Sequence, residues 1–412
     1  MLGRIVIWVI QATLSPFSAV ANQVYDWLDR RLPARRFMYR LLSDPVPERG
    51  GWWYTFGAAI FVLLIIQVVT GIFLMMYYVP SWNEARDSLL FIQNQVFLGS
   101  VVRGIHYWNM VALVLLVGLH MARTFVSSAY KTPRELTWVL GVTLMLLMVA
   151  TAFTGGILRW DQSGYFDVVV GTTIAGWTPI IGQWLAVIWR GGDTITSMTL
   201  TRTFAFHVWL LPALLLLLAP IHIALVVIQG QYGSWVNYEP EPPDTAPPDE
   251  DEVASLEKAK REALDPESRK VNVPTRTTWF FPYHIFRESV VSLGLFAAVF
   301  ICAYFVRVPI EAPVDPSTIT YAPTSMWFFL FIDQMFLIFP GAWMIPAGAV
   351  GAVTFVTVML YLLPWIDHSP GLRPQDRPVS IAFMFVIIFS LMVLALLAAS
   401  RVFNYDYINR PG

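Results

Sequence analysis

The stretch HYWNMVALVLLVGLH, residues 106–120, decides how the rest of the sequence is read. It carries a histidine at each end of a mostly apolar run, inside a segment of membrane-spanning length. The two histidines are fourteen positions apart, which is nearly four helical turns, so in a helix they share one face and lie about 21 Å apart. Because polar side chains are costly inside a bilayer, they tend to be functional there. The stretch therefore predicts a membrane helix that offers an imidazole at each of two depths.

The composition of the whole chain also indicates a membrane protein. Its 412 residues are 56% hydrophobic and only 13% charged, which is too apolar for an ordinary soluble domain. The net charge of −1 gives no reason to expect a nucleic-acid partner. The single cysteine, Cys302, excludes an intrachain disulfide and a cysteine-based zinc or iron–sulfur site. Any metal must be held by other ligands.

Runs of about twenty apolar residues predict an all-α integral membrane protein. The predicted transmembrane helices are 56–78, 103–123, 136–157, 205–228, 289–306, 344–364 and 379–399. They divide into a four-helix domain and a three-helix domain. The predicted domains are a cytoplasmic N-terminal segment with an amphipathic surface helix (1–50), the four-helix domain (51–230), an acidic, proline-rich cytoplasmic linker (231–278) and the three-helix C-terminal domain (279–412).

The distribution of positive charge predicts the orientation. Lysines and arginines gather in segments that are cytoplasmic if the N-terminus is inside, which predicts a cytoplasmic N-terminus and an outside C-terminus in a bacterial inner membrane. A signal peptide in the first 22 residues is the alternative, and the arginine-rich segment 30–40 argues against it. The outer connections 158–204 and 307–343 are long and aromatic, so we expect interfacial helices that wall a site there.

Four of the six histidines lie in just two predicted helices. Both helices run inward from the outer face, so His106 pairs in depth with His207 (the outer pair) and His120 with His222 (the inner pair). A level with two imidazoles and no acidic or thiolate ligand fits an axially ligated haem better than zinc, which takes three or four protein ligands. The predicted cofactors are two haem b groups, each with two histidine ligands. A histidine that only packs between helices is the alternative.

The spacing of the second pair needs a helix distortion. His207 and His222 are one residue further apart than the first pair, which rotates one relative to the other by about 100° in a regular helix. Pro212 and Pro220 lie between them, and proline permits such a distortion.

Glycines repeat at the period of the histidines. Gly57 and Gly71 are fourteen positions apart in the first predicted helix, and so are Gly141 and Gly155 in the third. The missing side chains would let a flat macrocycle approach the backbone. Ordinary helix packing through small residues is the alternative.

Two arginines lie near the outer pair. Arg103 precedes His106 by three residues and Arg202 precedes His207 by five. Arginine pairs with carboxylates bidentately, so both are candidates for binding haem propionates. The alternative role is anchoring the helix ends at the interface.

These residues resemble cytochrome b of the Rieske/cytochrome b complexes, which are quinol–cytochrome c and plastoquinol–plastocyanin reductases. The motifs HMARTFVSSAYKTPRELTWVLGV (120–142), GGILRWDQSGYF (155–166) and LTRTFAFHVWLLP (200–212) are similar to the photosynthetic branch, which shares the longer second spacing. The second half is similar to its separate three-helix subunit, so the chain looks like a natural fusion. FFPYHIFRES (280–289) resembles the respiratory branch instead. The resemblance covers nearly the whole chain.

The resemblance implies further site residues and partners. It implies that the two histidine pairs hold the two haems and that Arg287 and Glu288 bind and protonate quinone beside the inner one, as proton donors near the electron source would. A simple interfacial charged pair is the alternative for these two residues. Rieske iron–sulfur or c-type cytochrome subunits, the membrane quinone pool and a homodimer within a larger complex are the implied partners.

The sequence departs from that family at two places. Thr55 stands where the photosynthetic branch attaches a third haem through cysteine, so no covalently attached third haem is expected. The outer quinol-site motif Pro-Glu-Trp-Tyr reads Ser-Met-Trp-Phe here, and Met326 replaces the proton-accepting glutamate. Asp333, Asp161 and Tyr165 are the candidate replacements, each a catalytic-site prediction.

Three functions remain open from the sequence. The first is the core of a bifurcating quinol oxidase, in which the electrons of quinol are divided between an external carrier and the haems. The second is a non-bifurcating conduit that carries electrons between an external redox partner and an inner quinone site. Met326 favours the conduit, whereas the retained WDQSGY region favours quinol oxidation. A transporter that relays protons through its histidines is a third reading, and it predicts no haem absorbance.

Overall fold

The computed structural model describes residues 45–229, 277–318, 321, 324–338, 344–369 and 374–408, with a few residues between 23 and 31. The predicted amphipathic helix lies largely outside the described residues, and so does nearly all of the predicted linker. The chain divides into two compact units, residues 1–51 with 237–287 and residues 52–236 with 288–412. In the first unit, strand β1 (Pro45–Pro47) pairs with β2 (Thr277–Trp279) in antiparallel register, with Pro45 opposite Trp279. The turn η4 (Phe280–His284) follows β2.

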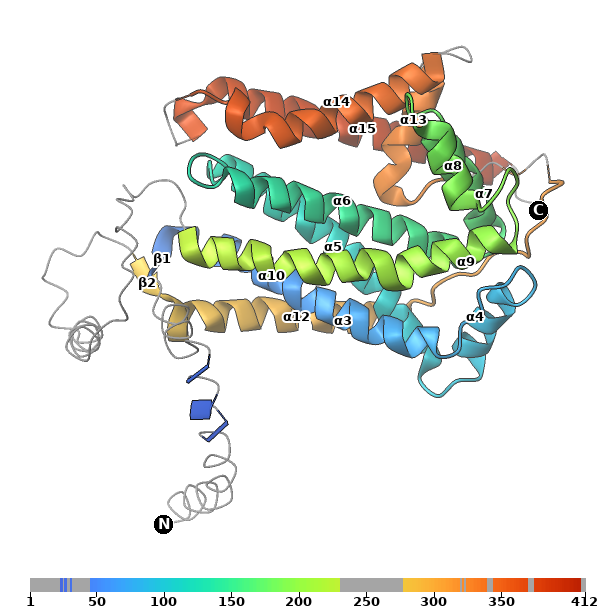
Figure 1. The fold of residues 1–412 in the computed structure, drawn as a ribbon, viewed down its shortest axis with the longest axis horizontal. Coiled ribbons are helices and arrows are strands. Elements are labelled where there is room, and N and C mark those ends of the chain that lie inside the picture. The colour runs from blue at the N-terminus through green and yellow to red at the C-terminus, as the bar shows by residue number, and fades with distance from the viewer. Residues whose placement is uncertain are drawn as a thin grey trace, which may run out of the picture. The chain divides into compact units, whose positions relative to one another are not determined.

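Helices make up most of the described residues, which confirms the predicted all-α membrane fold (Figure 1). Six helices in the described part are long and apolar enough to cross a membrane. They are α3 (Phe56–Met75, after the turn η1, Glu48–Thr55), α5 (Gly99–Val126), α6 (Glu135–Ile157), α9 (Ser197–Ala205) continued by η2 (Phe206–Leu210) and α10 (Leu211–Gln229), α12 (Ile285–Phe305) and α15 (Pro378–Ile408). The seventh predicted span coincides with α14 (Met344–Ile366), of which Val350–Ile366 forms a shorter apolar helix.

A leucine-rich core joins the helices of the four-helix part. Leu63 of α3, Leu113 of α5 and Leu215 of α10 are almost fully buried, and Met148 of α6 packs with them. On the opposite faces of the same helices, residues such as Leu119 and Leu217 stay exposed. A helix that is apolar on both faces fits lipid as its surroundings, where van der Waals packing holds helices together.

Short helices fill the long connections on the side of His106 and His207. The predicted interfacial helices within 158–204 are α7 (Gln162–Gly176) and α8 (Gly182–Arg190), and the one within 307–343 is α13 (Leu330–Ile338) after the turn η5 (Trp327–Phe329). A further helix, α4 (Ala85–Asn94), connects α3 to α5. Asp161 starts α7, because its Oδ1 accepts a hydrogen bond from the Gly164 amide at 3.0 Å and satisfies a free donor of the first turn.

The C-terminal helices α14 and α15 run beside α6 (Figure 1). The indole of Trp138 on α6 donates a hydrogen bond to the Leu360 carbonyl of α14 at 2.6 Å, and Thr143 and Tyr361 share one at 2.9 Å. These contacts fix α14 against the four-helix part.

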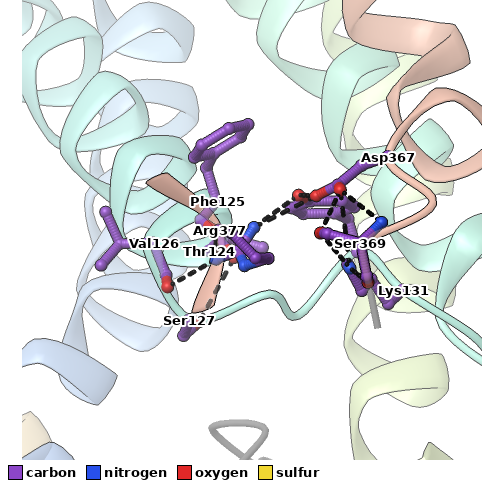
Figure 2. Close-up of polar contacts among 9 residues, drawn as sticks. Thr124, Phe125, Val126, Ser127, Lys131, Asp367, Ser369 and Arg377 are labelled. Carbon is purple, nitrogen blue, oxygen red and sulfur yellow. Dashed lines mark hydrogen bonds and ion pairs between the residues drawn. The ribbon is translucent and has the colours of Figure 1, made fainter. Parts of the chain in front are cut away.

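A buried polar cluster makes a second connection between the same two parts (Figure 2). Arg377, just before α15, donates to the carbonyls of Phe125 at 3.2 Å and Val126 at 3.0 Å, which are the last residues of α5. Its other nitrogen lies 3.3 Å from Asp367, at the end of α14. Both side chains are almost completely buried. Both terminal nitrogens of Arg377 therefore have hydrogen-bond partners, which support the buried ion pair, whereas its Nε has none among the described residues.

Candidate functional site

The structure brings His106 and His207 together, as their predicted depth requires. Their ring centroids are 6.2 Å apart and their planes cross at 75°. Nδ1 of His106 shares a hydrogen bond with Thr70 Oγ1 at 2.9 Å, and Nδ1 of His207 lies 3.2 Å from Thr154 Oγ1. Because the Nδ1 atoms are engaged, the Nε2 atoms are the ones available to a metal.

The two threonines were not found from the sequence, although a signal for them exists. Thr70 precedes Gly71 and Thr154 precedes Gly155, so a Thr-Gly pair occurs once in each of the two helices that face the outer histidines. The hydroxyl of each threonine also donates to a carbonyl in its own helix, Thr70 to Ile66 at 2.8 Å and Thr154 to Ala150 at 2.9 Å. Each hydroxyl is thereby fixed in place. The Thr70 hydroxyl can accept the Nδ1 proton of His106, whereas Nδ1 of His207 lies closer to the Thr151 carbonyl, at 3.0 Å, than to the Thr154 hydroxyl.

Each of the four periodic glycines faces one of the four histidines. A Cβ on Gly71 would lie 3.2 Å from Cε1 of His106, and one on Gly155 would lie 2.6 Å from Cε1 of His207. The inner pair repeats this arrangement, with Gly57 at 3.4 Å from His120 and Gly141 at 3.3 Å from His222. The period shared by glycines and histidines therefore has a direct cause: the missing side chain is the space in which the imidazole lies.

The extra residue between His207 and His222 is absorbed at a π-helical turn. This turn, η2, contains His207 and ends two residues before Pro212. Proline lacks the amide that would bond to the carbonyl four residues earlier, so a wider turn at this place loses little. The sequence predicted a distortion between the two histidines, and the structure gives its form. A five-residue hydrogen-bonding step inserts one residue and keeps both histidines on one helix face.

A cavity of about 660 Å³ opens beside the outer pair. Both histidines line it, with Gly71 and Gly155, and most of the other lining side chains are apolar. Arg103 also lines it and is buried, and it donates to the backbone carbonyls of Val308 at 2.9 Å and Pro309 at 3.2 Å.

Arg202, the second predicted propionate-binding arginine, makes different contacts from Arg103. Its Nη1 donates to the Ile188 carbonyl, and it is not among the described residues that line the cavity. Of the two predicted propionate-binding arginines, the structure thus brings only Arg103 to the cavity. The role of both remains a prediction.

The three predicted replacements for the missing glutamate do not line the cavity in the described structure. Asp161 is fully buried. Its Oδ2 accepts a hydrogen bond from the Glu311 amide at 2.9 Å, and its Oδ1 accepts one from the Gly164 amide at the start of α7, so both oxygens bind backbone amides. Asp333 accepts from the Ser325 amide at 3.0 Å and from its hydroxyl at 2.5 Å. Burial raises the pKa of Asp333 although these hydrogen bonds oppose the shift. Tyr165 packs edge-on against Trp82.

A different carboxylate faces the cavity. Asp167 on α7 is the one acidic side chain among the described residues that line it, and Met326 lies on the same wall. Its Oδ2 has no hydrogen-bond partner in the described structure and lies 3.8 Å from Nη2 of Arg159. Burial raises the pKa of Asp167 to about 7, against the opposing charge of Arg159. The motif GGILRWDQSGYF ends one residue before Asp167, so the motif alone did not point to it.

The predicted inner quinone residues Arg287 and Glu288 lie in the first turn of α12. Nη1 of Arg287 is buried without a hydrogen-bond partner among the described residues. A quinone site built on these two residues stays a prediction.

Comparison with known proteins gives the family. The family model "Cytochrome b/b6/petB" matches residues 41–230. The menaquinol:cytochrome c reductase cytochrome b subunit of Bacillus subtilis is 39% identical over 220 residues, which is 52% of this chain and 98% of that relative. This chain belongs to the cytochrome b family. The predicted resemblance is thereby confirmed, and with it an integral membrane cytochrome b of a haem-binding family.

Further matches cover both halves of this cytochrome b. The cytochrome b6 of Heliomicrobium gestii is 36% identical over 206 residues, or 50% of this chain and 97% of that relative. A chain of a solved hyperthermophilic respiratory complex III matches with a TM-score of 0.73 and 28% sequence identity, and covers 91% of each chain. The structural similarity to this complex III chain therefore extends beyond the four-helix part into the C-terminal part of the chain.

Proposed function

We propose that this cytochrome b carries electrons across the bilayer through two haem b groups, between quinol or quinone and a redox partner, as the membrane subunit of a bc-type complex. The observation that carries the proposal is the pairing of the histidines in two levels. His106 and His207 would hold one haem, and His120 and His222 the other. When bound, the haem iron supplies one-electron chemistry.

The geometry of the outer pair supports haem ligation. The two rings would be able to hold one iron between them, because a metal–imidazole bond is about 2 Å long and the separation of the ring centroids leaves room for a metal. The observed separation is 6.2 Å. The threonine contacts of Nδ1 hold both rings in one tautomer. Arg103 would reach propionates from the cavity wall.

The quinone sites belong to the same proposal. The haem would lie between the outer histidines, and the part of the same cavity that Gly156, Asp167 and Met326 line would take a quinol, because the cavity wall is apolar with a few polar groups. Arg287 and Glu288 would serve the inner quinone site. The Bacillus subtilis relative is named a menaquinol:cytochrome c reductase subunit, which supports quinol as donor and a c-type cytochrome as acceptor. A Rieske iron–sulfur subunit would be the other partner. We further propose a homodimeric complex in a bacterial inner membrane, with the N-terminus cytoplasmic and the C-terminus outside.

One observation favours a second function. Met326, at the cavity wall, cannot accept a proton, and the predicted acid Asp333 is occupied by Ser325. The alternative is therefore a non-bifurcating conduit, in which an external c-type or other redox partner exchanges electrons with the inner quinone site and the outer quinol site is inactive.

Purification of the complex in mild detergent tests both functions. We expect two haem b per chain in a dithionite-reduced minus oxidised spectrum, and loss of the outer haem alone in His106→Ala. His120→Ala is the matched control, with loss of the inner haem. A preparation without haem absorbance overturns the proposal and favours the proton relay. Copurification of a Rieske protein supports bifurcation, whereas a multihaem c-type subunit without one supports the conduit.

A further inference from the structure

We infer that Asp167 accepts the proton of a quinol bound in the part of the cavity that Gly156 and Met326 line. The inference rests on the proposed function for its substrate and names a catalytic residue outside the sequence-predicted candidates. Three observations support it: the position of the Asp167 carboxylate, its Oδ2 atom without a hydrogen-bond partner among the described residues, and the charged groups around it.

The position of Asp167 is the first support. Asp167 and Met326 both line the cavity that contains the outer histidines, and both approach Gly156 of α6. A Cβ on Gly156 would overlap the methyl group of Met326 at 1.6 Å and would lie 3.8 Å from Oδ2 of Asp167. The carboxylate thus lies on the same side of α6 as the methionine side chain. A ligand that touches one also meets the other.

The open oxygen is the second support. Oδ2 of Asp167 is buried and has no hydrogen-bond partner among the described residues. A buried carboxylate oxygen without a partner is unfavourable in a protein at rest. A quinol hydroxyl is a donor that would satisfy it. Asp161 and Asp333, by contrast, already accept hydrogen bonds on both oxygens.

The neighbouring charges are the third support. Arg159 Nη2 lies 3.8 Å from Oδ2 and also donates to the Ser163 hydroxyl at 2.9 Å, so it stays fixed when Asp167 changes charge. Asp161, Asp333 and Glu311 are the acidic groups that act on Asp167, and they oppose its ionisation. Arg159 favours the carboxylate and the three acids favour the protonated form. A group balanced in this way can take a proton and release it again near neutral pH.

The proposed step transfers a proton from the quinol hydroxyl to Asp167. The O–H bond of the quinol hydroxyl breaks, a new O–H bond forms at Oδ2 of Asp167, and the electron pair stays on the quinol oxygen. This step needs no oxidant. The oxidation that follows passes electrons to one-electron acceptors, which in the proposed function are the haem of the outer pair and the external redox partner.

The test measures reduction of added cytochrome c by 2,3-dimethyl-1,4-naphthoquinol in membranes that contain the whole complex. For the wild type we expect a rate that rises with pH through about 7, because only ionised Asp167 accepts a proton. Asp167→Asn should lower the rate about a hundredfold and remove this inflection, with both haem absorbances retained. Asp167→Glu keeps a carboxylate and should retain part of the rate with a displaced inflection.

Two controls make the result decisive. Asp87→Asn changes an exposed carboxylate of α4 that is not among the residues lining the cavity and should keep the wild-type profile. Asp333→Asn should keep the inflection, and loss of the inflection there but not in Asp167→Asn overturns the inference. A wild-type rate and profile in Asp167→Asn also overturns it. If the wild type itself has haem but no quinol-dependent rate, outer quinol oxidation fails, and the proposed function is reduced to the conduit.

Discussion

Thr70 and His106 are joined across two helices by a hydrogen bond of 2.9 Å between Oγ1 and Nδ1. Thr154 and His207 repeat the relationship at 3.2 Å. The outer histidines are thus each held by a threonine that precedes the glycine in contact with the same ring. Groups of this kind orient a metal ligand and affect the affinity of the site.

Replacement of these hydroxyls should loosen the outer haem. For Thr70→Val we expect about a tenfold weaker retention of the outer haem and an altered midpoint potential, with the inner haem unaffected. Redox titration of the two haem bands measures both. Thr143→Val is the control, because its hydroxyl bonds to Tyr361 and not to a histidine. An unchanged outer haem in Thr70→Val would show that the hydroxyl does not position His106.

The glycines should differ in their tolerance of a methyl group. Gly155→Ala places a Cβ 2.6 Å from His207, whereas Gly57→Ala places one 3.4 Å from His120, which is ordinary contact. We expect loss of the outer haem in Gly155→Ala and retention of both haems in Gly57→Ala. Gly118→Ala is a control in α5, since nothing lies within 4 Å of its Cβ position. Haem content per chain distinguishes the outcomes, and equal content in all three variants contradicts the model of the site.

A carboxylate at position 326 should compensate for the loss of Asp167. Both side chains reach the region of Gly156 from the same cavity. In an Asp167→Asn background, Met326→Glu should therefore restore at least about a tenth of the wild-type quinol oxidation rate. Met326→Gln in the same background is the control, because it has the same shape without a base. Equal rates in the two double variants would mean that a base at position 326 does not reach the quinol.

The buried cluster of Figure 2 should make stability depend on acid. Burial opposes ionisation of Asp367, but hydrogen bonds from Ser369 and Tyr130 outweigh it and the pKa is lowered. A carboxylate with a lowered folded-state pKa stabilises the fold fully above its unfolded pKa of about 4. That contribution is lost as the pH falls through the folded value.

Thermal unfolding of the detergent-solubilised complex checks this dependence. Asp367→Asn leaves Arg377 buried without its charge partner, so we expect a loss of about 3 kcal/mol at pH 7 and a weaker acid dependence than in the wild type. Lys131→Met removes a charge 3.6 Å from Asp367 and the hydrogen bonds of Nζ to Ser369, but it leaves Arg377 paired with Asp367 and should have a smaller effect. A variant as stable as the wild type at pH 7 would show that the pair does not hold α5 against α15.

Much of the haem-binding part could be predicted from the sequence, because its signals are periodic along single helices. The spans, the paired histidines and the glycines at the same period all follow from helix geometry. Asp167 could not be found in this way. Its importance depends on Met326 and on the described residues around Asp315, which are more than a hundred residues away in the chain. The hydrogen bonds between Gln162 and Asp315, at 2.7 and 3.1 Å, bring these segments together and have no signature in the local pattern.

Contacts that the local sequence pattern does not reveal also explain why the predicted acids do not line the cavity. In a regular helix Asp333 would lie two turns from Met326 and on a similar face, but the segment begins with an extended Met326 and a tight turn at Trp327–Phe329. The carboxylate instead folds back on Ser325. Asp161, which lies in the most similar motif, is needed to begin α7 and to hold the Glu311 amide.

The π-helical turn at Phe206–Leu210 has a consequence for how this family can vary. A π-helical turn accommodates one extra residue, so the number of residues between His207 and His222 can change while the face of the helix on which both lie does not. An insertion there changes the numbering of everything that follows without rotating His222 away from His120. Cytochromes b with either spacing between their second pair of histidines can therefore share one spatial arrangement, so a difference of one residue between two such sequences is no evidence of a different electron path.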